Sequence, residues 1–287
     1  MDQPLSGKTC LVTGATSGIG KVTARELAGM GARVVFTARD ARKADAVKSE
    51  IVRAVPKALL EVIQVDLSSM RAVRNAAADY RRRFTRLDLL VNNAGAIFWK
   101  RETTVDGLER TFATNHLAHF LLTRELLDLL KASAPSRIVN VASNAHRRGR
   151  IHFDDLQLER GYSAWGAYGQ SKLANILFTR ELANRLQGTG VTANAVHPGV
   201  VATSFGRSGS AWMDLLYRLG APFLLSPDKG ARTTLYVGTA PELENHSGGY
   251  FAHSSQATPS PEAQDDDSAK RLWDESERIL QRVLAPS

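Results

Sequence analysis

Short apolar runs rich in β-branched residues recur along the chain and are separated by longer stretches with helical periodicity. The runs cover residues 8–13, 33–37, 60–65, 87–91, 137–141 and 192–196. This alternation predicts βαβ units, and therefore a parallel sheet with helices on both faces. Right-handed crossovers make such a sheet a doubly wound α/β sheet, in which ligands bind beyond the carboxyl ends of the strands. We therefore expect functional residues directly after these runs.

The chain is expected to form a single domain over residues 1–287, because it contains no internal repeat and no long low-complexity linker. Its 43% hydrophobic content excludes disordered and collagen-like chains. Pro259 and Pro261, followed by an acidic run, predict the start of a C-terminal helix over 268–284 that packs back on the body. The one cysteine, Cys10, excludes an internal disulfide and fits a reducing compartment.

The net charge of +8 is compatible with nucleic acid, a membrane surface or an anionic small ligand as partner. The densest basic runs, 81–83 and 147–150, lack interleaved aromatic residues, so we expect solvated surface and no nucleic-acid partner. The N-terminal residues show no basic segment followed by an apolar one, and no stretch approaches the roughly 20 apolar residues of a membrane span. We therefore expect a cytoplasmic protein without a transmembrane anchor.

A glycine-rich segment at 13–20, TGATSGIG, follows the first predicted strand and opens a helix. The backbone amides of such a turn approach a pyrophosphate, and the helix N-terminus adds positive potential. A glycine triplet alone fits a tight turn equally well, and its place within a βαβ unit makes it a dinucleotide-binding candidate. The residues expected to bind the dinucleotide here are Gly14, Thr16, Ser17, Gly18, Ile19 and Gly20.

The end of the second strand distinguishes the two nicotinamide dinucleotides. A carboxylate there receives the ribose hydroxyls of NAD(H), whereas the 2′-phosphate of NADP(H) needs positive charge. Arg39 occupies that position, and Lys21, after the last glycine, adds a second cation, so the sequence favours NADP(H). In the alternative interpretation Arg39 points to solvent and Asp40 receives the ribose.

Two further segments follow strands at the same predicted edge. Asp66, with Leu67 after it, is placed to hydrogen-bond the adenine, although Asp66 also suits an N-cap for a helix starting near Ser68. The fourth strand is followed by Asn92, Asn93, Ala94 and Gly95. Their small side chains permit close approach to a ligand, and the same tetrapeptide also fits an ordinary turn.

Tyr168 and Lys172 lie four residues apart on a predicted helix, and therefore on one face. A phenol titrates near pH ~10, and an adjacent ammonium stabilises the phenolate and lowers its pKa. Ser143, at the end of the fifth strand, is placed to donate a hydrogen bond to a substrate oxygen. A Tyr and Lys pair at this spacing is usually a surface coincidence, so the pair alone does not identify a site.

Taken together, these ordered motifs resemble the short-chain dehydrogenase/reductase family over nearly the full chain, and most of all its retinol dehydrogenase-like branch, to which light-dependent protochlorophyllide reductase is related. A gap of 25 residues between Ser143 and Tyr168 is typical of that branch. The segments that carry the resemblance are 13–20, 37–40, 92–95, 114–120, 167–179, 197–199 and 248–251.

The resemblance implies a Rossmann fold and a tetrad of Asn115, Ser143, Tyr168 and Lys172. Tyr168 would act as the general acid in reduction and the base in oxidation, and Lys172 would lower its pKa and bind the nicotinamide ribose. Ser143 would hold the substrate oxygen. Asn115 would anchor a water that relays protons to Lys172, a role compatible with a structural one in a bulged helix. The residues implied to line the nicotinamide are Pro198, Gly199, Val200, Val201 and Thr203.

Segments 146–166 and 204–225 follow the fifth and sixth strands, where a substrate pocket should open. Their apolar side chains suit a hydrophobic carbonyl or alcohol such as a retinoid, steroid or lipid aldehyde or ketone, but they fit core closure equally well. These side chains are Phe153, Trp165, Phe205, Trp212, Met213, Leu216 and Phe223. No metal is expected, because His116, His119 and His197 lack a metal-ligand context and are assigned supporting roles.

The sequence thus predicts an NADP(H)-dependent oxidoreductase, a carbonyl reductase or alcohol dehydrogenase. The alternative is a catalytically silent protein of the same fold that senses NADP(H) or binds partners. The complete tetrad favours the enzyme. Helices expected over 105–131 and 167–186 pair across homodimers or homotetramers in the family, although amphipathic helices fit a monomer as well.

Overall fold

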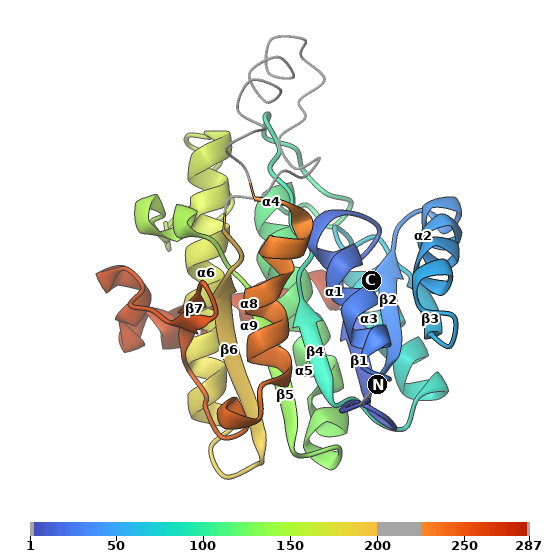
Figure 1. Cartoon of the computed structure of the whole chain (residues 1–287). Coiled ribbons are helices and arrows are strands. Elements are labelled where there is room, and N and C mark those ends of the chain that lie inside the picture. The colour runs from blue at the N-terminus through green and yellow to red at the C-terminus, as the bar shows by residue number, and fades with distance from the viewer. Residues whose placement is uncertain (1–2, 200–224, 286–287) are drawn as a thin grey trace.

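An eight-stranded sheet runs through the centre of the protein in the order β3-β2-β1-β4-β5-β6-β7-β8 (Figure 1). The structure is a computed structural model that describes residues 3–199 and 225–285. Neighbouring strands are parallel from β3 through to β7, and β8 alone is antiparallel to its neighbour. The strands are β1 (Thr9–Val12), β2 (Arg33–Ala38), β3 (Leu59–Gln64), β4 (Leu89–Asn92), β5 (Ser136–Val141), β6 (Val191–His197), β7 (Tyr250–Ala252) and β8 (Ser255–Gln256). The predicted doubly wound α/β fold is confirmed.

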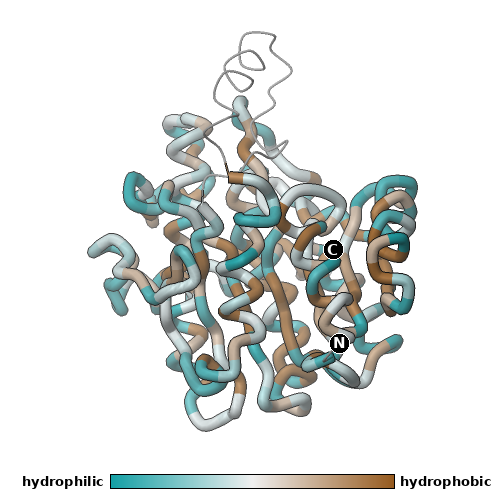
Figure 2. Tube along the Cα trace, viewed as in Figure 1, coloured by the Kyte–Doolittle hydropathy of each residue, from teal (hydrophilic) through white to brown (hydrophobic). Residues whose placement is uncertain are grey.

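The central strands are apolar on both faces because helices cover both faces of the sheet. In the pairing of β1 with β4, Cys10 lies beside Leu89 and Leu11 beside Leu90, and all four side chains are buried. Figure 2 shows the hydrophobic colour concentrated along these inner strands. Such continuous apolar runs hold the carboxyl ends of the strands at a fixed edge.

Helices form one layer on each face of the sheet (Figure 1). One buried cluster joins the sheet to α1, α2 and α8, and the other joins it to α3, α5, α6 and α9. The helices are α1 (Gly18–Gly29), α2 (Ala41–Ala54), α3 (Met70–Arg83), α4 (Arg110–Phe112), α5 (Ala118–Ala132), α6 (Ala164–Arg185), α8 (Pro227–Thr239) and α9 (Asp266–Leu284). Between α4 and α5 lies η1 (Ala113–Leu117), a single π-helical turn.

The helix expected over 105–131 starts later and is interrupted. It begins at Arg110 because the buried carboxylate of Glu109 accepts the backbone N–H groups of Thr111 and Phe112, both at 2.7 Å. It then passes through the π-turn η1, where the Ala118 N–H bonds to the Ala113 carbonyl, five residues back. A π-turn inside a helix is frequently a functional feature.

The chain ends in α9, which starts where Asp265 accepts the Asp267 N–H. Its apolar face packs against α5 and α6, with the Trp273 ring 4.7 Å from that of Phe120 and 5.9 Å from that of Phe178. The sequence predicted a helix over 268–284, and the observed one is two residues longer at its start.

The strand order changes direction between β1 and β4, since successive strands run outward from this pair to opposite edges of the sheet. Ligands of this type of sheet usually bind in the crevice outside the carboxyl ends of the strands at this point, here β1 and β4.

Candidate active site

The glycine-rich turn after β1 is built for close backbone approach. Gly14 has a φ of +67°, and a Cβ there would lie 2.9 Å from Ala94. A Cβ on Gly20 would lie 2.4 Å from Nδ2 of Asn93 and 2.5 Å from the Gly14 carbonyl oxygen. Any larger residue at Gly14 or Gly20 would therefore push the start of α1 away from the turn after β4.

Thr13 joins the two turns into one unit. Its Oγ1 accepts the backbone N–H groups of Asn93 and Ala94, both at 2.9 Å. The Asn93 amide donates to the Thr13 carbonyl at 2.8 Å in return. The expected dinucleotide-binding segments around residues 13–20 and 92–95 therefore lie against each other at the crevice between β1 and β4.

The start of α1 offers backbone donors toward this crevice. Ser17 precedes the helix but makes no side-chain capping bond, so the N–H groups of the first turn keep their capacity to bind an anion. Gly18, Ile19 and Gly20 form that first turn, directly after Thr16 and Ser17. These residues fit the diphosphate of a dinucleotide.

A pocket of about 570 Å³ opens at the carboxyl end of β2. It is lined by Arg39, Asp40, Ala41, Arg42, Lys43 and Gln64. The Asp40 carboxylate caps α2, because its Oδ1 accepts the backbone N–H groups of Arg42 at 2.9 Å and Lys43 at 3.2 Å. Three cationic side chains therefore surround the pocket against one carboxylate that is already hydrogen-bonded to the helix.

Two residues expected near the adenosine make other contacts in the structure. Lys21 forms an ion pair with Glu50 of α2, with 2.7 Å between Nζ and Oε1, and so it serves α1 to α2 packing. Asp66 accepts the N–H and hydroxyl of Ser68 at 2.9 and 2.8 Å, while Ser69 is the N-cap of α3. Burial acts to raise the pKa of Asp66, but the Ser68 hydrogen bonds and Arg39 outweigh it and lower that pKa. Leu67 packs against the core.

The structure brings Tyr168, Lys172 and Ser143 together. Tyr168 is hydrogen-bonded to Ser143, and the Lys172 Nζ lies 5.6 Å from the centroid of the Tyr168 ring. Lys172 donates a 2.9 Å hydrogen bond to the Val141 carbonyl at the end of β5. A Cβ on Gly95 would lie 3.2 Å from the Lys172 Nζ, so the lysine faces the turn after β4.

Asn115 lies in the π-turn and joins the same cluster. Its Nδ2 donates to the Ala96 carbonyl at 2.9 Å and to the Ser171 hydroxyl at 3.0 Å, and its Oδ1 accepts the Ala96 N–H at 2.8 Å. The Oδ1 atom also lies 3.6 Å from the position of a Cβ on Gly95. The Asn115 side chain thus fixes the segment that follows β4.

Burial governs the charge of this cluster. It lowers the pKa of Lys172 to about 8 and raises the pKa of Tyr168 to about 12, although the hydrogen bond with Ser143 lowers the latter in part. The pKa of Tyr168 is thus raised here, not lowered as expected, because the loss of water around the phenol outweighs its hydrogen bond with Ser143. Tyr168 is therefore protonated at neutral pH.

Two buried histidines fix the backbone around Ser143. The His146 Nδ1 lies 2.6 Å from the Ser143 carbonyl, and its Nε2 accepts the Ser260 N–H at 3.0 Å. The His197 Nδ1 accepts the Asn144 N–H at 3.3 Å. The contact of His146 is not predictable from the sequence, because nothing there places Ser260 beside it.

On the nicotinamide side, β6 ends at His197 and leads into Pro198 and Gly199, whose φ is +86°. A Cβ on Gly199 would lie 2.4 Å from the Leu225 side chain. The other residues expected here and in the second substrate segment lie outside the described residues: Val200, Val201, Thr203, Phe205, Trp212, Met213, Leu216 and Phe223.

Aromatic side chains collect next to Tyr168. Trp165, 64% exposed, stands edge-on to the Tyr168 ring at 6.2 Å and to the Trp99 ring at 6.4 Å. Ile97 is buried in the same cluster. Sequence reasoning missed Trp99 and Ile97, although both follow β4 at the functional edge. Phe153, also expected in the pocket, instead lies under the guanidinium of Arg271 of α9.

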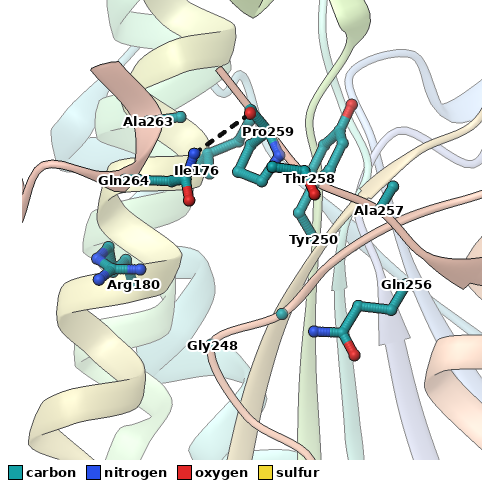
Figure 3. Close-up of a pocket in the computed structure, with 11 residues that line it drawn as sticks. Ile176, Arg180, Gly248, Tyr250, Gln256, Ala257, Thr258, Pro259, Ala263 and Gln264 are labelled. Carbon is teal, nitrogen blue, oxygen red and sulfur yellow. Dashed lines mark hydrogen bonds between the residues drawn. The ribbon is translucent and has the colours of Figure 1, made fainter. Parts of the chain in front are cut away.

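A second pocket, of about 200 Å³, lies between α6 and the C-terminal segment (Figure 3). Arg180, Tyr250, Thr258 and Gln264 are among its lining residues, and Arg180 is paired with Asp266. The Tyr250 hydroxyl donates a 3.0 Å hydrogen bond to Oδ1 of Asn144, the residue after Ser143. The lining of this pocket includes no residue of the turns at 13–20 and 92–95.

Comparison with known proteins identifies the chain's family. The family model for short chain dehydrogenase matches residues 8–214, more than half of the chain. The chain belongs to the short-chain dehydrogenase family. This short-chain dehydrogenase is 47% identical to human retinol dehydrogenase 12 over 276 residues, which cover 96% of this chain and 87% of that protein. It is 46% identical to human retinol dehydrogenase 13, over 99% of this chain and 87% of that protein.

Solved structures share the fold of this short-chain dehydrogenase. A putative uncharacterized protein from Mycobacterium paratuberculosis superimposes with a TM-score of 0.79 at 35% identity, covering 96% of this chain and 94% of that one. The RhlG/NADP active-site complex of Pseudomonas aeruginosa gives a TM-score of 0.69 at 27% identity, covering 88% and 97%. Over residues 3–199 and 225–285, no helix combines the length and apolar character needed to cross a membrane.

Proposed function

We propose that this short-chain dehydrogenase is an NADP(H)-dependent oxidoreductase that transfers a hydride between the nicotinamide and a hydrophobic carbonyl or alcohol. The observation that carries the proposal is the buried contact of Tyr168 with Ser143 and Lys172, directly opposite Gly95. It supports the proposal because Tyr168 could donate a proton, with Ser143 and Lys172 beside it, at the edge where the proposed dinucleotide-binding turns meet.

Reduction would use the protonated form of Tyr168. When bound, NADPH supplies the hydride. The Tyr168 hydroxyl donates its proton to the substrate oxygen, and the Ser143 hydroxyl donates a second hydrogen bond to the same oxygen. Lys172 would bind the nicotinamide ribose and stabilise the phenolate that remains after proton transfer. Asn115 would hold the water that returns a proton toward Lys172.

The choice of NADP(H) rests on the pocket after β2. Because Asp40 is committed to capping α2, it is a poor acceptor for ribose hydroxyls, while Arg39, Arg42 and Lys43 line a space that suits a 2′-phosphate. The complex of a structural relative is described as containing NADP. With Lys21 paired to Glu50, Arg39 carries this assignment.

The apolar cluster formed by Trp99, Trp165 and Ile97 supports an apolar substrate. It offers apolar surface beside the ring of Tyr168, so the reacting oxygen would lie at the Tyr168 hydroxyl and the apolar body of the substrate near the indole rings. Relatives named retinol dehydrogenases are consistent with such a substrate, and we propose retinoid-like, steroid-like or other lipid aldehydes, ketones or alcohols.

The test is the loss of reduced-nicotinamide absorbance when the purified protein meets a panel of hydrophobic aldehydes, ketones and quinones, once with NADPH and once with NADH. Turnover with NADPH in preference to NADH is expected. Tight binding of NADPH without turnover of any panel member would favour the alternative, a protein that senses NADP(H).

A further inference from the structure

His119, near the start of α5, connects the catalytic π-turn to the dinucleotide turn. Its Nδ1 lies 3.1 Å from the Asn115 carbonyl oxygen, and its Nε2 lies 3.1 Å from Oγ1 of Thr13. The side chain is 1% exposed, and Thr13 is fully buried. These two contacts join Thr13 and Asn115, which lie far apart in the sequence.

The partners determine which nitrogen of His119 carries the proton. A carbonyl oxygen only accepts, so Nδ1 is protonated and donates to Asn115. Nε2 is then unprotonated and accepts the hydroxyl proton of Thr13. Burial, together with the positive charge of Lys172, lowers the pKa of His119 to about 3, so this neutral tautomer persists across the physiological pH range.

The acceptor at Nε2 sets the direction of the Thr13 hydroxyl. Because the Thr13 hydroxyl points its hydrogen at His119, the lone pairs of Oγ1 are left to accept the N–H groups of Asn93 and Ala94 at 2.9 Å each. The competing acceptor, the Val91 carbonyl, is farther away at 3.4 Å. His119 thus fixes a hydroxyl that in turn holds the segment before Gly95.

We propose that His119 is a positioning residue that couples the cofactor-binding turns to the catalytic π-turn, one ring nitrogen serving each. The inference rests on the proposed function, because it assigns the Thr13 arm to dinucleotide binding and the Asn115 arm to turnover. It predicts that the two arms separate on mutation, which simple core packing by His119 would not produce.

Two near-isosteric variants separate the arms. In His119→Asn the amide nitrogen replaces Nδ1 and keeps the Asn115 contact, but the side chain is too short to reach Thr13. In His119→Gln the amide lies near the Nε2 position and keeps the Thr13 contact, while the Asn115 contact is lost. His119→Phe removes both contacts and retains the ring.

The measurements are the Kd for NADPH, from fluorescence titration without substrate, and kcat with a carbonyl from the panel. We expect His119→Asn to raise the Kd about three- to tenfold with little loss of kcat, and His119→Gln to lower kcat by a similar factor with a near-native Kd. The Phe variant should show both losses. A control for stability alone is Leu272→Ala, since Leu272 is fully buried in α9 and lies outside both turns; it should lower the Tm and shift Kd and kcat little.

The inference would be overturned if the Asn and Gln variants showed the same rise in Kd and the same fall in kcat. It would also be overturned if these variants changed only the Tm. The Kd comparison decides it even if no panel carbonyl is turned over, because it needs no substrate. A failure of the proposed function would instead appear in the native protein, as absence of turnover. A Thr13→Val change should raise the Kd less in the Asn variant than in the native protein, because the Thr13 to His119 bond is already lost there.

Discussion

Lys172 holds its ammonium 2.9 Å from the carbonyl oxygen of Val141, the residue that ends β5 two positions before Ser143. The lysine is thereby tied to the strand that delivers the serine, while its own helix delivers Tyr168. Burial lowers the pKa of Lys172 to about 8, which makes its charged form costly in the folded protein. The lysine that the proposed mechanism requires therefore lowers the stability of the folded protein.

Replacing Lys172 with methionine should stabilise the fold and abolish turnover. The folded-state pKa of about 8 lies below the ordinary 10.5. The buried charge therefore lowers the free energy of unfolding fully below pH 8, and this destabilisation disappears as the pH rises past 10.5. Lys172→Met should therefore raise the free energy of unfolding at pH 7 by roughly 1–3 kcal/mol, allowing for the lost Val141 hydrogen bond. Thermal melts at pH 7 and pH 10 check this, because the gain should shrink at the higher pH. A variant less stable than the native protein at pH 7 would contradict it.

Carbonyl reduction should lose rate as the pH rises through the pKa of Lys172. Below about pH 8 the ammonium is protonated and supplies the proton relay, and above it the relay is depleted, while Tyr168, whose pKa is raised to about 12, stays protonated. The profile of kcat against pH with NADPH and one aldehyde measures this. A rate that increases from pH 8 to pH 10 would refute the assignment.

Arg39 should discriminate between the two dinucleotides. Removing its guanidinium from the pocket after β2 is expected to raise the Kd for NADPH about 10- to 100-fold and to leave the Kd for NADH nearly unchanged, because only NADPH carries the 2′-phosphate. Fluorescence titration of Arg39→Ala with both dinucleotides measures this. The charge-matched control is Arg278→Ala on the exposed face of α9. Equal affinity of native and Arg39→Ala proteins for NADPH would show that the assignment is wrong.

The C-terminal helix should contribute strongly to stability. Leu272 of α9 is fully buried against the α5 and α6 side of the core, so Leu272→Ala should lower the free energy of unfolding by about 2–5 kcal/mol. Urea denaturation measures the loss, and the exposed Arg278→Ala should change it by less than about 0.5 kcal/mol. If the two variants unfolded at the same urea concentration, α9 would not be an integral part of the fold.

Local sequence patterns predicted most of the sheet, because buried parallel strands are apolar throughout and end at turn residues. The observed β5 begins one residue before the predicted run 137–141, and β6 extends the predicted run 192–196 by one residue at each end. The short β7 and β8 were not predicted as strands. Three and two residues long, they are defined by pairing with β6 and with each other, which the local sequence does not encode.

Residues of the candidate site could be predicted where their type and their place after a strand agree. Contacts that depend on a partner distant in the sequence could not be predicted. Ser143, Tyr168 and Lys172 meet as the family resemblance implies, whereas strand ends and helix spacing alone predicted only that Tyr168 and Lys172 share a helix face. Capture of Asp40 by the start of α2 and of Lys21 by Glu50 depends on side-chain competition that spacing does not reveal. The position of the π-turn around Asn115 likewise cannot be read from the helical periodicity of the sequence.

The most direct test of the account compares the native protein with Tyr168→Phe in NADPH-dependent reduction of a hydrophobic aldehyde. The variant lacks only the phenolic hydroxyl, so we expect kcat to fall by about 10²–10⁴-fold while the Kd for NADPH stays native. Turnover at the native rate in Tyr168→Phe would contradict the central claim that this hydroxyl transfers the proton.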